Sequence, residues 1–209
     1  MALEDDIRGM LNLILLIILG YLLGSVPWGL LISKAKGIDI RKVGSGNIGG
    51  TNVVRGLGFK WGLLTGILDV AKGVVPIFLA VKILSPDWQI ALVAVSPVLG
   101  HIFPVWLNFK GGKGVATTVG ALSILLAWPN FLILILVWAL TLALLKIMSL
   151  TNILLSALLP LILWFMYSSP AYSILGLVFF ILICWAHREN IQRLREGKEP
   201  KFKLKKTRQ

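Results

Sequence analysis

The sequence predicts an all-α integral membrane protein, a helical bundle with about seven transmembrane helices. Hydrophobic residues make up 57% of the 209 residues, and the mean hydropathy is +0.86. Only 14% of the residues are charged, whereas a soluble domain has about a quarter. The apolar residues also gather in blocks close to the ~20 residues that a helix needs to cross a bilayer. We therefore expect most apolar side chains to face lipid.

Seven apolar segments account for the predicted helices and leave no room for a separate soluble domain. They lie near residues 10–33, 61–84, 90–107, 115–128, 131–148, 153–167 and 172–186. The fourth and sixth are short, which leaves open whether they are tilted partners or incomplete spans. Residues 1–209 are thus predicted to form one domain with a basic cytoplasmic tail from about residue 187 to 209.

The distribution of Lys and Arg predicts an N-terminus outside the cell and a cytoplasmic C-terminus. Residues 34–60, 108–114, 146–152 and 187–209 together contain 18 basic residues, whereas the opposite side contains two, Arg8 and Lys82. Cytoplasmic loops carry such an excess of basic residues. The glycine-rich loops described next are therefore expected on the cytoplasmic face.

The net charge of +12 fits contacts with the anionic head groups of a lipid bilayer and with anionic substrates. Nucleic acid is not an expected partner, because the chain has neither a groove-reading motif nor exposed stacking aromatic residues. Cys184 is the only cysteine, which excludes a disulfide framework and a thiol metal site. No metal, cofactor or obligate protein partner is predicted.

The first of three polar stretches is GSGNIGGTNVVR, residues 44–55. Glycines such as Gly44 let backbone N–H groups converge on an anion. Ser45, Asn47 and Thr51 add neutral donors, and the Arg55 guanidinium can bind a phosphate through two N–H groups at once. A flexible connecting loop is the alternative, but such a loop rarely combines this many glycines with these polar residues. The spacing of the glycines also matches GxGxxG, yet no strand precedes it, so a dinucleotide site is not predicted.

The second stretch, GHIFPVWLNFKGGKGVAT at residues 100–117, contains a glycine turn at the start of a predicted helix. Lys113 and its neighbour Lys110 would flank Gly111, Gly112 and Gly114, close to the positive end of the helix dipole. The pattern is not a P-loop, because GxxxxGK[ST] is absent. An ordinary cytoplasmic turn would explain the lysines but not the glycines.

The third stretch is HRENIQRL at residues 187–194, followed by GKEP. If the last span continues as a helix beyond the membrane surface, His187, Asn190 and Leu194 share one face. His187 could donate to a phosphate or take up a proton near neutral pH; a satisfied histidine at the membrane surface is the equal alternative.

Three further polar residues lie within predicted spans. Asp69 and Lys72 are three residues apart on one helical face. Ionisable groups inside a membrane mark function or pair with each other, and the sequence leaves both open. His101 is expected to order its helix rather than to react.

The three stretches, in this order, resemble the motifs of the acyl-phosphate-dependent glycerol-3-phosphate acyltransferases of bacteria, the PlsY family. The resemblance covers nearly the whole chain. Ile48 stands where the family often has Pro, and Gly50 where it often has Ala, but neither departure removes a polar group.

The resemblance implies a multi-pass enzyme of the bacterial inner membrane that acts in phospholipid biosynthesis. Its partners would be acyl phosphate and sn-glycerol 3-phosphate, and its products lysophosphatidic acid and phosphate. Catalytic roles are implied for Ser45, Arg55, Lys113, His187 and Asn190. Roles in binding the substrate phosphates are implied for Gly44, Asn47, Thr51, Gly111, Gly112, Gly114, Arg193 and Glu199. Glu199, expected to be exposed, could instead only order the tail.

Two functions from other classes remain as alternatives. A transporter of a phosphorylated or carboxylate anion would also have helices broken by glycine and a cationic site, but the polar stretches lie on one face and no internal repeat is visible. A lipid-binding scaffold would leave the three stretches unexplained.

Overall fold

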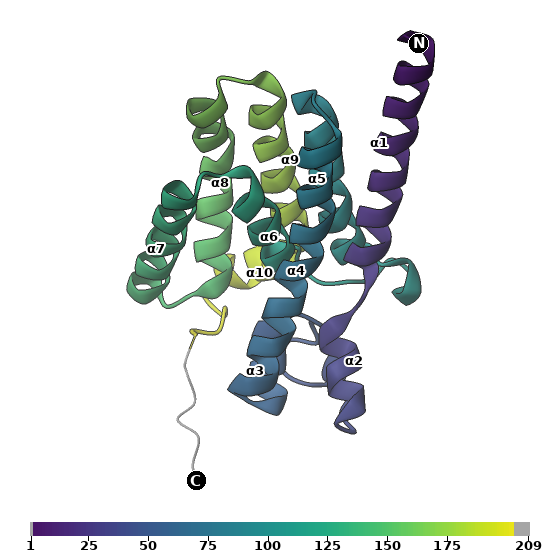
Figure 1. The fold of residues 1–209 in the computed structure, drawn as a ribbon. Helices are drawn as coiled ribbons and strands as arrows, with labels where there is room; N and C mark the ends of the chain where they lie inside the picture. Colours follow the sequence, from purple (N-terminus) through teal and green to yellow (C-terminus); the bar gives the residue numbers. More distant parts are fainter. Residues whose placement is uncertain (1, 203–209) are drawn as a thin grey trace. The chain divides into compact units, whose positions relative to one another are not determined.

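The computed structural model describes residues 2–202, and within this range every regular element is helical (Figure 1). The elements are α1 (Ala2–Ser25), α2 (Trp28–Ala35), η1 (Ile40–Lys42), α3 (Gly50–Leu57), α4 (Phe59–Ile83), α5 (Asp87–Ile102), η2 (Val105–Leu107), α6 (Val115–Leu125), α7 (Trp128–Leu145), α8 (Met148–Tyr167), α9 (Pro170–Ala186) and α10 (Arg188–Arg195). The all-α prediction is confirmed for these residues.

The chain separates into two compact units, Met1–Leu125 and Leu126–Gln209. The first unit contains α1 to α6 with both short 3-10 turns, and the second contains α7 to α10. The prediction of a single domain is not tested by this division and stays a prediction.

In the first unit, α1 packs against α5, and the two backbones approach closely at glycines. A Cβ atom on Gly24 would lie 2.2 Å from the Pro97 carbonyl oxygen, and one on Gly100 would lie 2.2 Å from the Tyr21 carbonyl oxygen. Small residues at such crossings are a common way for membrane helices to gain packing contacts.

Glycines also bring α6 against α4. A Cβ atom on Gly73 would lie 2.1 Å from the Thr117 carbonyl oxygen, and one on Gly120 would lie 2.1 Å from the Val70 carbonyl oxygen. The start of α6, which follows the second glycine-rich loop, is thereby fixed against a long apolar helix.

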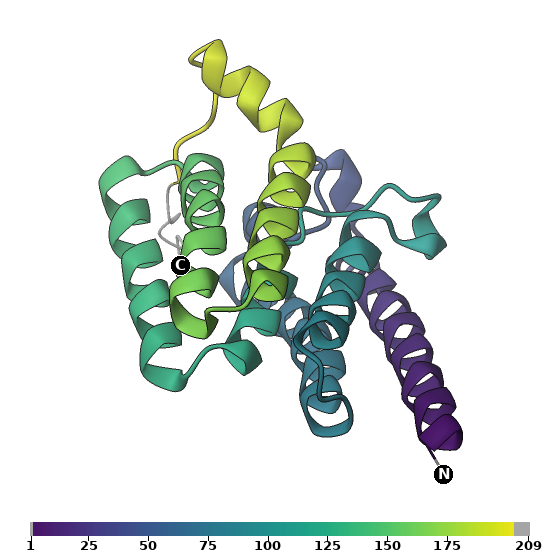
Figure 2. The ribbon, with the colours of Figure 1, turned by 90° about the horizontal axis from the view of Figure 1, so that it is seen from above.

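In the second unit, α8 lies between α7 and α9 (Figure 2). Gly176 of α9 faces the backbone of α8, since a Cβ atom there would lie 2.6 Å from the Leu159 carbonyl carbon. The indole Nε1–H of Trp138 on α7 donates to the Asn152 side chain on α8 at 2.9 Å. The helices α7, α8 and α9 are thus joined by specific contacts.

The seven predicted spans are not confirmed, and their number stays a prediction. Five helical segments among the described residues are long and apolar enough to cross a membrane, or up to six if the bent pair α9 and α10 counts as one span. The segment 115–128 forms only the 11-residue helix α6, about 16 Å long at 1.5 Å per residue. Pro129 lies in the first turn of α7, a position where Pro commonly starts a helix.

The helix that contains the predicted segment 153–167 is longer than expected. The segment is part of the 20-residue helix α8, which begins at Met148, so the expectation of a short sixth span is wrong. The polar residues Thr151 and Asn152 interrupt the apolar run, so hydropathy did not indicate the first turn of α8. The orientation across the membrane stays a prediction, and residues 203–209 of the predicted basic tail lie outside the described residues.

Candidate active site

The first glycine-rich loop is built around one buried side chain, Asn52. Its amide nitrogen lies 3.1, 2.9 and 2.8 Å from the carbonyl oxygens of Ile40, Val43 and Asn47, to which it donates. Its amide oxygen accepts a hydrogen bond from the Ser45 backbone N–H at 3.0 Å. Asn52 is only 2% exposed. Sequence reasoning assigned it no role, although a second Asn in so short a loop was a usable signal.

Glycine is required in this loop by conformation and by space. Gly44 and Gly46 have φ angles of 57° and 70°, which side chains with a Cβ atom rarely adopt. A Cβ atom on Gly44 would also lie 2.5 Å from the Asn52 amide oxygen. Asn47 accepts a hydrogen bond from the Gly49 backbone N–H at 2.9 Å, so its side-chain oxygen shapes the turn that leads into α3.

Ser45 and Arg55 lie on the exposed side of the same loop, and Thr51 in the first turn of α3 is half-buried. A Cβ atom on Gly44 would lie 3.5 Å from Cδ of Arg55, so the stem of Arg55 passes beside the loop backbone. No other residue in the described range, 2–202, forms a hydrogen bond or ion pair with the Arg55 guanidinium. Its N–H groups can therefore bind an anion.

A buried apolar cluster lies beneath the first loop and connects it to the second. The cluster consists of Leu30, Ile40, Ile48 and Val53, and Leu107 from the second loop packs against it. The first unit therefore brings two of the three predicted polar stretches together, although residues 48 and 107 are far apart in the sequence.

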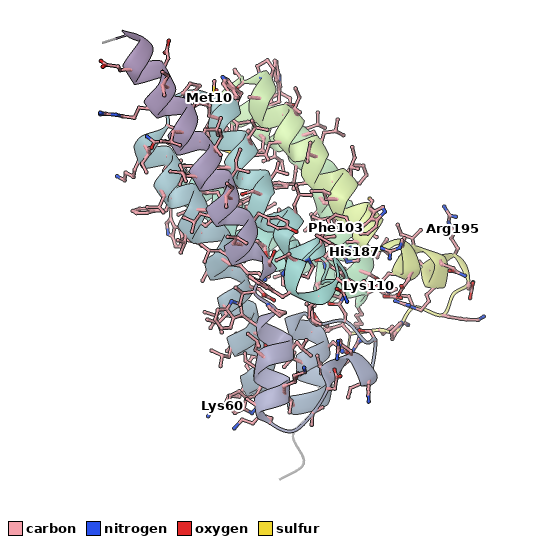
Figure 3. All side chains as sticks on the ribbon, turned by 90° about the vertical axis from the view of Figure 1, so that its right-hand side faces the viewer. Met10, Lys60, Phe103, Lys110, His187 and Arg195 are labelled. Carbon is pink, nitrogen blue, oxygen red and sulfur yellow. The ribbon has the colours of Figure 1, made fainter. Side chains whose placement is uncertain are left out.

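The second loop leaves α5 after Ile102 and returns to the end of the same helix. Figure 3 labels Phe103 where the loop begins and Lys110 where it turns back. The Gly111 backbone N–H then donates to the Ile102 carbonyl oxygen at 3.0 Å, and the Gly112 N–H donates to the His101 carbonyl oxygen at 2.9 Å. The Tyr21 hydroxyl on α1 donates to the Phe103 carbonyl oxygen at 2.7 Å.

This close return explains why glycine stands at two positions. A Cβ atom on Gly111 would lie 2.2 Å from the His101 carbonyl oxygen, and one on Gly112 would lie 2.1 Å from His101 Nε2. The amides of Gly111 and Gly112 are occupied by α5 carbonyl groups, so glycine is needed here for contact with α5. The predicted role of these glycines in wrapping a phosphate is not tested and stays a prediction.

The cationic part of the second loop lies next to the start of α6. Lys110 is exposed and Lys113 is half-buried. Gly114 has a φ angle of 75°, and its carbonyl oxygen accepts from the Thr118 N–H at 2.8 Å, which begins α6. Two ammonium groups and the N-terminal end of a helix favour an anion at this position.

The third stretch belongs to the second unit, where α10 follows α9 with a bend of 64°. The chain therefore does continue as a helix after α9, but only beyond a bend. Figure 3 labels His187 before the start and Arg195 at the end of α10. His187 is 1% exposed, and its Nδ1 lies 2.8 Å from the Ile183 carbonyl oxygen, to which the protonated nitrogen donates.

Glu199 holds α10 in place and is not the exposed acid that the sequence predicted. Its side chain is 7% exposed, and Arg193 Nε donates to its Oε2 at 2.8 Å. Oε1 accepts hydrogen bonds from the Asn190 amide and from the Ser149 hydroxyl, the latter at 2.7 Å. Burial acts to raise the pKa of Glu199, but these hydrogen bonds outweigh it and hold the pKa below its usual value. Ser149 had no signal in the sequence, because it lies 50 residues away.

The long apolar helices define an integral membrane protein. Its two cationic, glycine-rich loops, which meet on one apolar cluster, form a candidate site for anionic substrates. The family model described as glycerol-3-phosphate acyltransferase matches residues 14–197. The chain belongs to this family, as the predicted resemblance indicated.

Curated relatives and solved structures agree with the family. A glycerol-3-phosphate acyltransferase of Geobacter metallireducens is 51% identical over 194 residues, covering 93% of this chain and 100% of the relative. One of Aquifex aeolicus is 42% identical, covering 90% and 97%. The crystal structure of PlsY, an integral membrane glycerol 3-phosphate acyltransferase, in its glycerol 3-phosphate form has a TM-score of 0.87 and 40% identity, with 91% of this chain and 96% of that chain covered. Its lysophosphatidic acid form has a TM-score of 0.85 and 39% identity, covering 92% and 96%.

Proposed function

We propose that this chain transfers a fatty acyl group from acyl phosphate to the 1-hydroxyl of sn-glycerol 3-phosphate. The products are lysophosphatidic acid and inorganic phosphate, and the reaction takes place at the cytoplasmic face of the bacterial inner membrane. The observation that carries the proposal is the pair of glycine-rich loops that meet on one apolar cluster. Membership of the family supports the acceptor, and the resemblance of all three stretches supports the donor.

The chemistry asks mainly for binding and orientation. Acyl phosphate is a mixed anhydride with a good leaving group. The acceptor oxygen attacks the acyl carbon, the bond from that carbon to the phosphate oxygen breaks, and the released phosphate takes the hydroxyl proton. Two phosphates carry like charges, so cationic groups that hold them reduce their repulsion and align the hydroxyl.

In the first unit, Arg55 and Lys113 are the proposed ligands of the substrate phosphates. Arg55 offers two N–H groups in one plane and Lys113 a point charge. Ser45 and Thr51 add hydroxyl donors on the first loop, with Gly44 and Asn47 shaping the backbone between them. Each of these residues acts by holding a substrate.

In the second unit, His187, Asn190 and Arg193 are further proposed phosphate ligands on the bend between α9 and α10. Glu199 holds Asn190 and Arg193 by hydrogen bonds. The donor's own phosphate is the proposed proton acceptor, and His187 is the second candidate.

No metal or cofactor takes part in the proposed reaction. The described residues contain no group of three or more His, Cys, Asp or Glu side chains arranged to hold a metal ion. The prediction is checked by assaying phosphate release with and without a chelator, which should leave the rate unchanged.

The proposal is tested with purified protein in detergent micelles, by following phosphate release from acyl phosphate with and without glycerol 3-phosphate. Release should require the acceptor, and lysophosphatidic acid should form in equal amount. Lys82→Ala, an exposed basic residue in the last turn of α4, is the matched control for Arg55→Ala and Lys113→Ala. Comparable turnover with acyl-CoA would disprove the donor assignment, and absence of any transfer would disprove the function.

A further inference from the structure

A buried polar network connects α4 with α5 in the first unit, below the candidate site. Lys72 Nζ lies 3.1 Å from Asp69 Oδ1, and His101 Nδ1 lies 3.7 Å from the same oxygen. The three side chains are 4%, 3% and 5% exposed. Burying two charges and an imidazole in an apolar helical body costs desolvation free energy. A protein with apolar residues of similar size in their place is often equally stable.

Lys72 reaches from this network to the support of the first loop. Its Nζ donates at 2.9 Å to the carbonyl oxygen of Val26, in the break between α1 and α2, where the same oxygen also accepts the Trp28 backbone N–H at 3.1 Å. Immediately beyond the break, α2 contacts the first loop, since a Cβ atom on Gly29 would lie 1.9 Å from the Ile48 carbonyl oxygen. Lys72 thus fixes the chain segment on which the first loop rests.

His101 reaches from the same network to the second loop. Its backbone carbonyl accepts the Gly112 N–H, and its Nε2 faces Gly112 so closely that a Cβ atom there would lie 2.1 Å away. On the other side of the ring, Nδ1 is buried, points toward Asp69 and has no hydrogen-bond partner among residues 2–202. The imidazole therefore fills the space between Asp69 and the glycine turn.

Mutual neutralisation of Asp69 and Lys72 does not account for this arrangement. If Asp69 and Lys72 only neutralised each other, Lys72 would have no need of its hydrogen bond to the Val26 carbonyl oxygen. The contact of His101 with Gly112 would also remain unexplained. We infer that Lys72, Asp69 and His101 are positioning residues. They hold the Gly111–Gly112 turn, and with it Lys113, in a fixed position relative to the first loop. This inference rests on the proposed function, in which Lys113 binds a substrate phosphate.

The first experiment compares Asp69→Asn, Lys72→Met and the double variant. Each single variant leaves one buried charge without its partner, so both should lower the melting temperature in detergent. The double variant removes both charges and should regain stability. Its KM for acyl phosphate should nevertheless rise about tenfold or more, because small displacements of a binding group are costly, while kcat changes less than KM.

A second pair of variants distinguishes the contribution of the His101 ring from that of the Asp69 and Lys72 charges. In His101→Gln the amide can reach the position of Nε2 beneath Gly112, whereas His101→Ala leaves that space empty. Gln should restore much of the affinity for acyl phosphate that Ala loses. Ser96→Ala is the matched control, because Ser96 is a buried polar residue of the same helix whose hydroxyl donates to the Val93 carbonyl oxygen of that helix. If the double variant fails to fold, the His101 pair decides the question.

Hydrogen–deuterium exchange of substrate-free protein tests the positioning without any activity. The Gly111 and Gly112 amides should exchange faster in the double variant and in His101→Ala than in Ser96→Ala. If the wild-type protein shows no acyltransferase activity and the variants still exchange faster, the proposed function is refuted and the positioning role stands. Unchanged exchange together with wild-type KM would overturn the inference, as would a fall in kcat with unchanged KM.

Discussion

At the scale of single residues, the polar side chains of the first loop divide into two groups. Asn52 and Asn47 use their side chains to shape the loop from inside. Ser45 and Arg55 lie on its exposed side. The first group should govern the stability of the loop, and the exposed second group should govern substrate affinity. The predicted role of Asn47 in binding a substrate phosphate stays a prediction.

The Arg55→Lys variant tests whether the guanidinium binds phosphate through two N–H groups. Lysine keeps the charge but offers a point donor, so we expect a loss on the order of 2 kcal/mol or more in transition-state binding, measured from kcat/KM. Arg41→Lys is the control, since Arg41 is exposed and bonds Asp39 at 2.9 and 2.7 Å; its effect should stay within about 0.5 kcal/mol. Near wild-type activity of Arg55→Lys would show that Arg55 supplies only a general positive field.

Ser45 is expected to bind rather than to attack. A serine nucleophile needs a base within hydrogen-bond reach, and among the described residues 2–125 the structure shows no hydrogen bond between the Ser45 hydroxyl and a base. Ser45→Ala should therefore lower activity without changing the kinetic pattern. Intact-protein mass spectrometry after mixing with acyl phosphate alone should show no acyl adduct. A stoichiometric adduct on Ser45 that disappears when glycerol 3-phosphate is added would contradict direct transfer.

At the scale of elements, each glycine-rich loop is positioned by a helix behind it. The second loop depends on close contact with α5, and Gly112→Ala should disturb it because a Cβ atom there would lie 2.1 Å from His101 Nε2. We expect KM for acyl phosphate to rise at least about tenfold. Gly66→Ala on α4 is the control, since a Cβ atom there meets no atom within 4 Å. Equal kinetic constants for the two variants would show that the contact between Gly112 and His101 does not position the second loop.

The position of α10 depends on Glu199, and this dependence should vary with pH. The pKa of Glu199 is lower in the folded protein than its usual value of 4.5, so its carboxylate stabilises the fold above that pH. The contribution is lost as the pH falls through the lowered pKa.

Glu199→Gln should therefore lower the melting temperature at pH 7, by an amount equivalent to about 1–3 kcal/mol. The difference from wild type should shrink as the pH falls below 4.5. Glu196→Gln is the control, because Glu196 is exposed and pairs only with groups near the surface. A difference that does not vary with pH would mean that the Glu199 charge has no part in holding α10.

At the scale of the whole molecule, the prediction concerns orientation across the membrane. Eighteen basic residues on one side predict that this side is cytoplasmic. We expect Lys198→Cys to react with an impermeant thiol reagent only after cells are opened, and Ser85→Cys to react in intact cells, both in a Cys184→Ser background. Both positions are exposed. The reverse labelling pattern would overturn the orientation and the cytoplasmic site.

Much of the protein could be predicted from the sequence alone. Apolar blocks and sparse charge determine an all-helical membrane protein, because hydropathy over about 20 residues is a local property. The three polar stretches are each contiguous, so their residues and the family resemblance were also readable without a structure.

Only the tertiary structure decided which residues meet. Leu107 joins the two loops at one apolar cluster, His101 lies beneath Gly112, and Ser149 bonds Glu199. Helix ends were decided there too, because an apolar run does not reveal where α6 stops or that Thr151 belongs to α8. The physical reason is that contacts between residues distant in the sequence depend on how helices pack. Local hydropathy and spacing determine the helices, but they carry no information about which helix faces fit together.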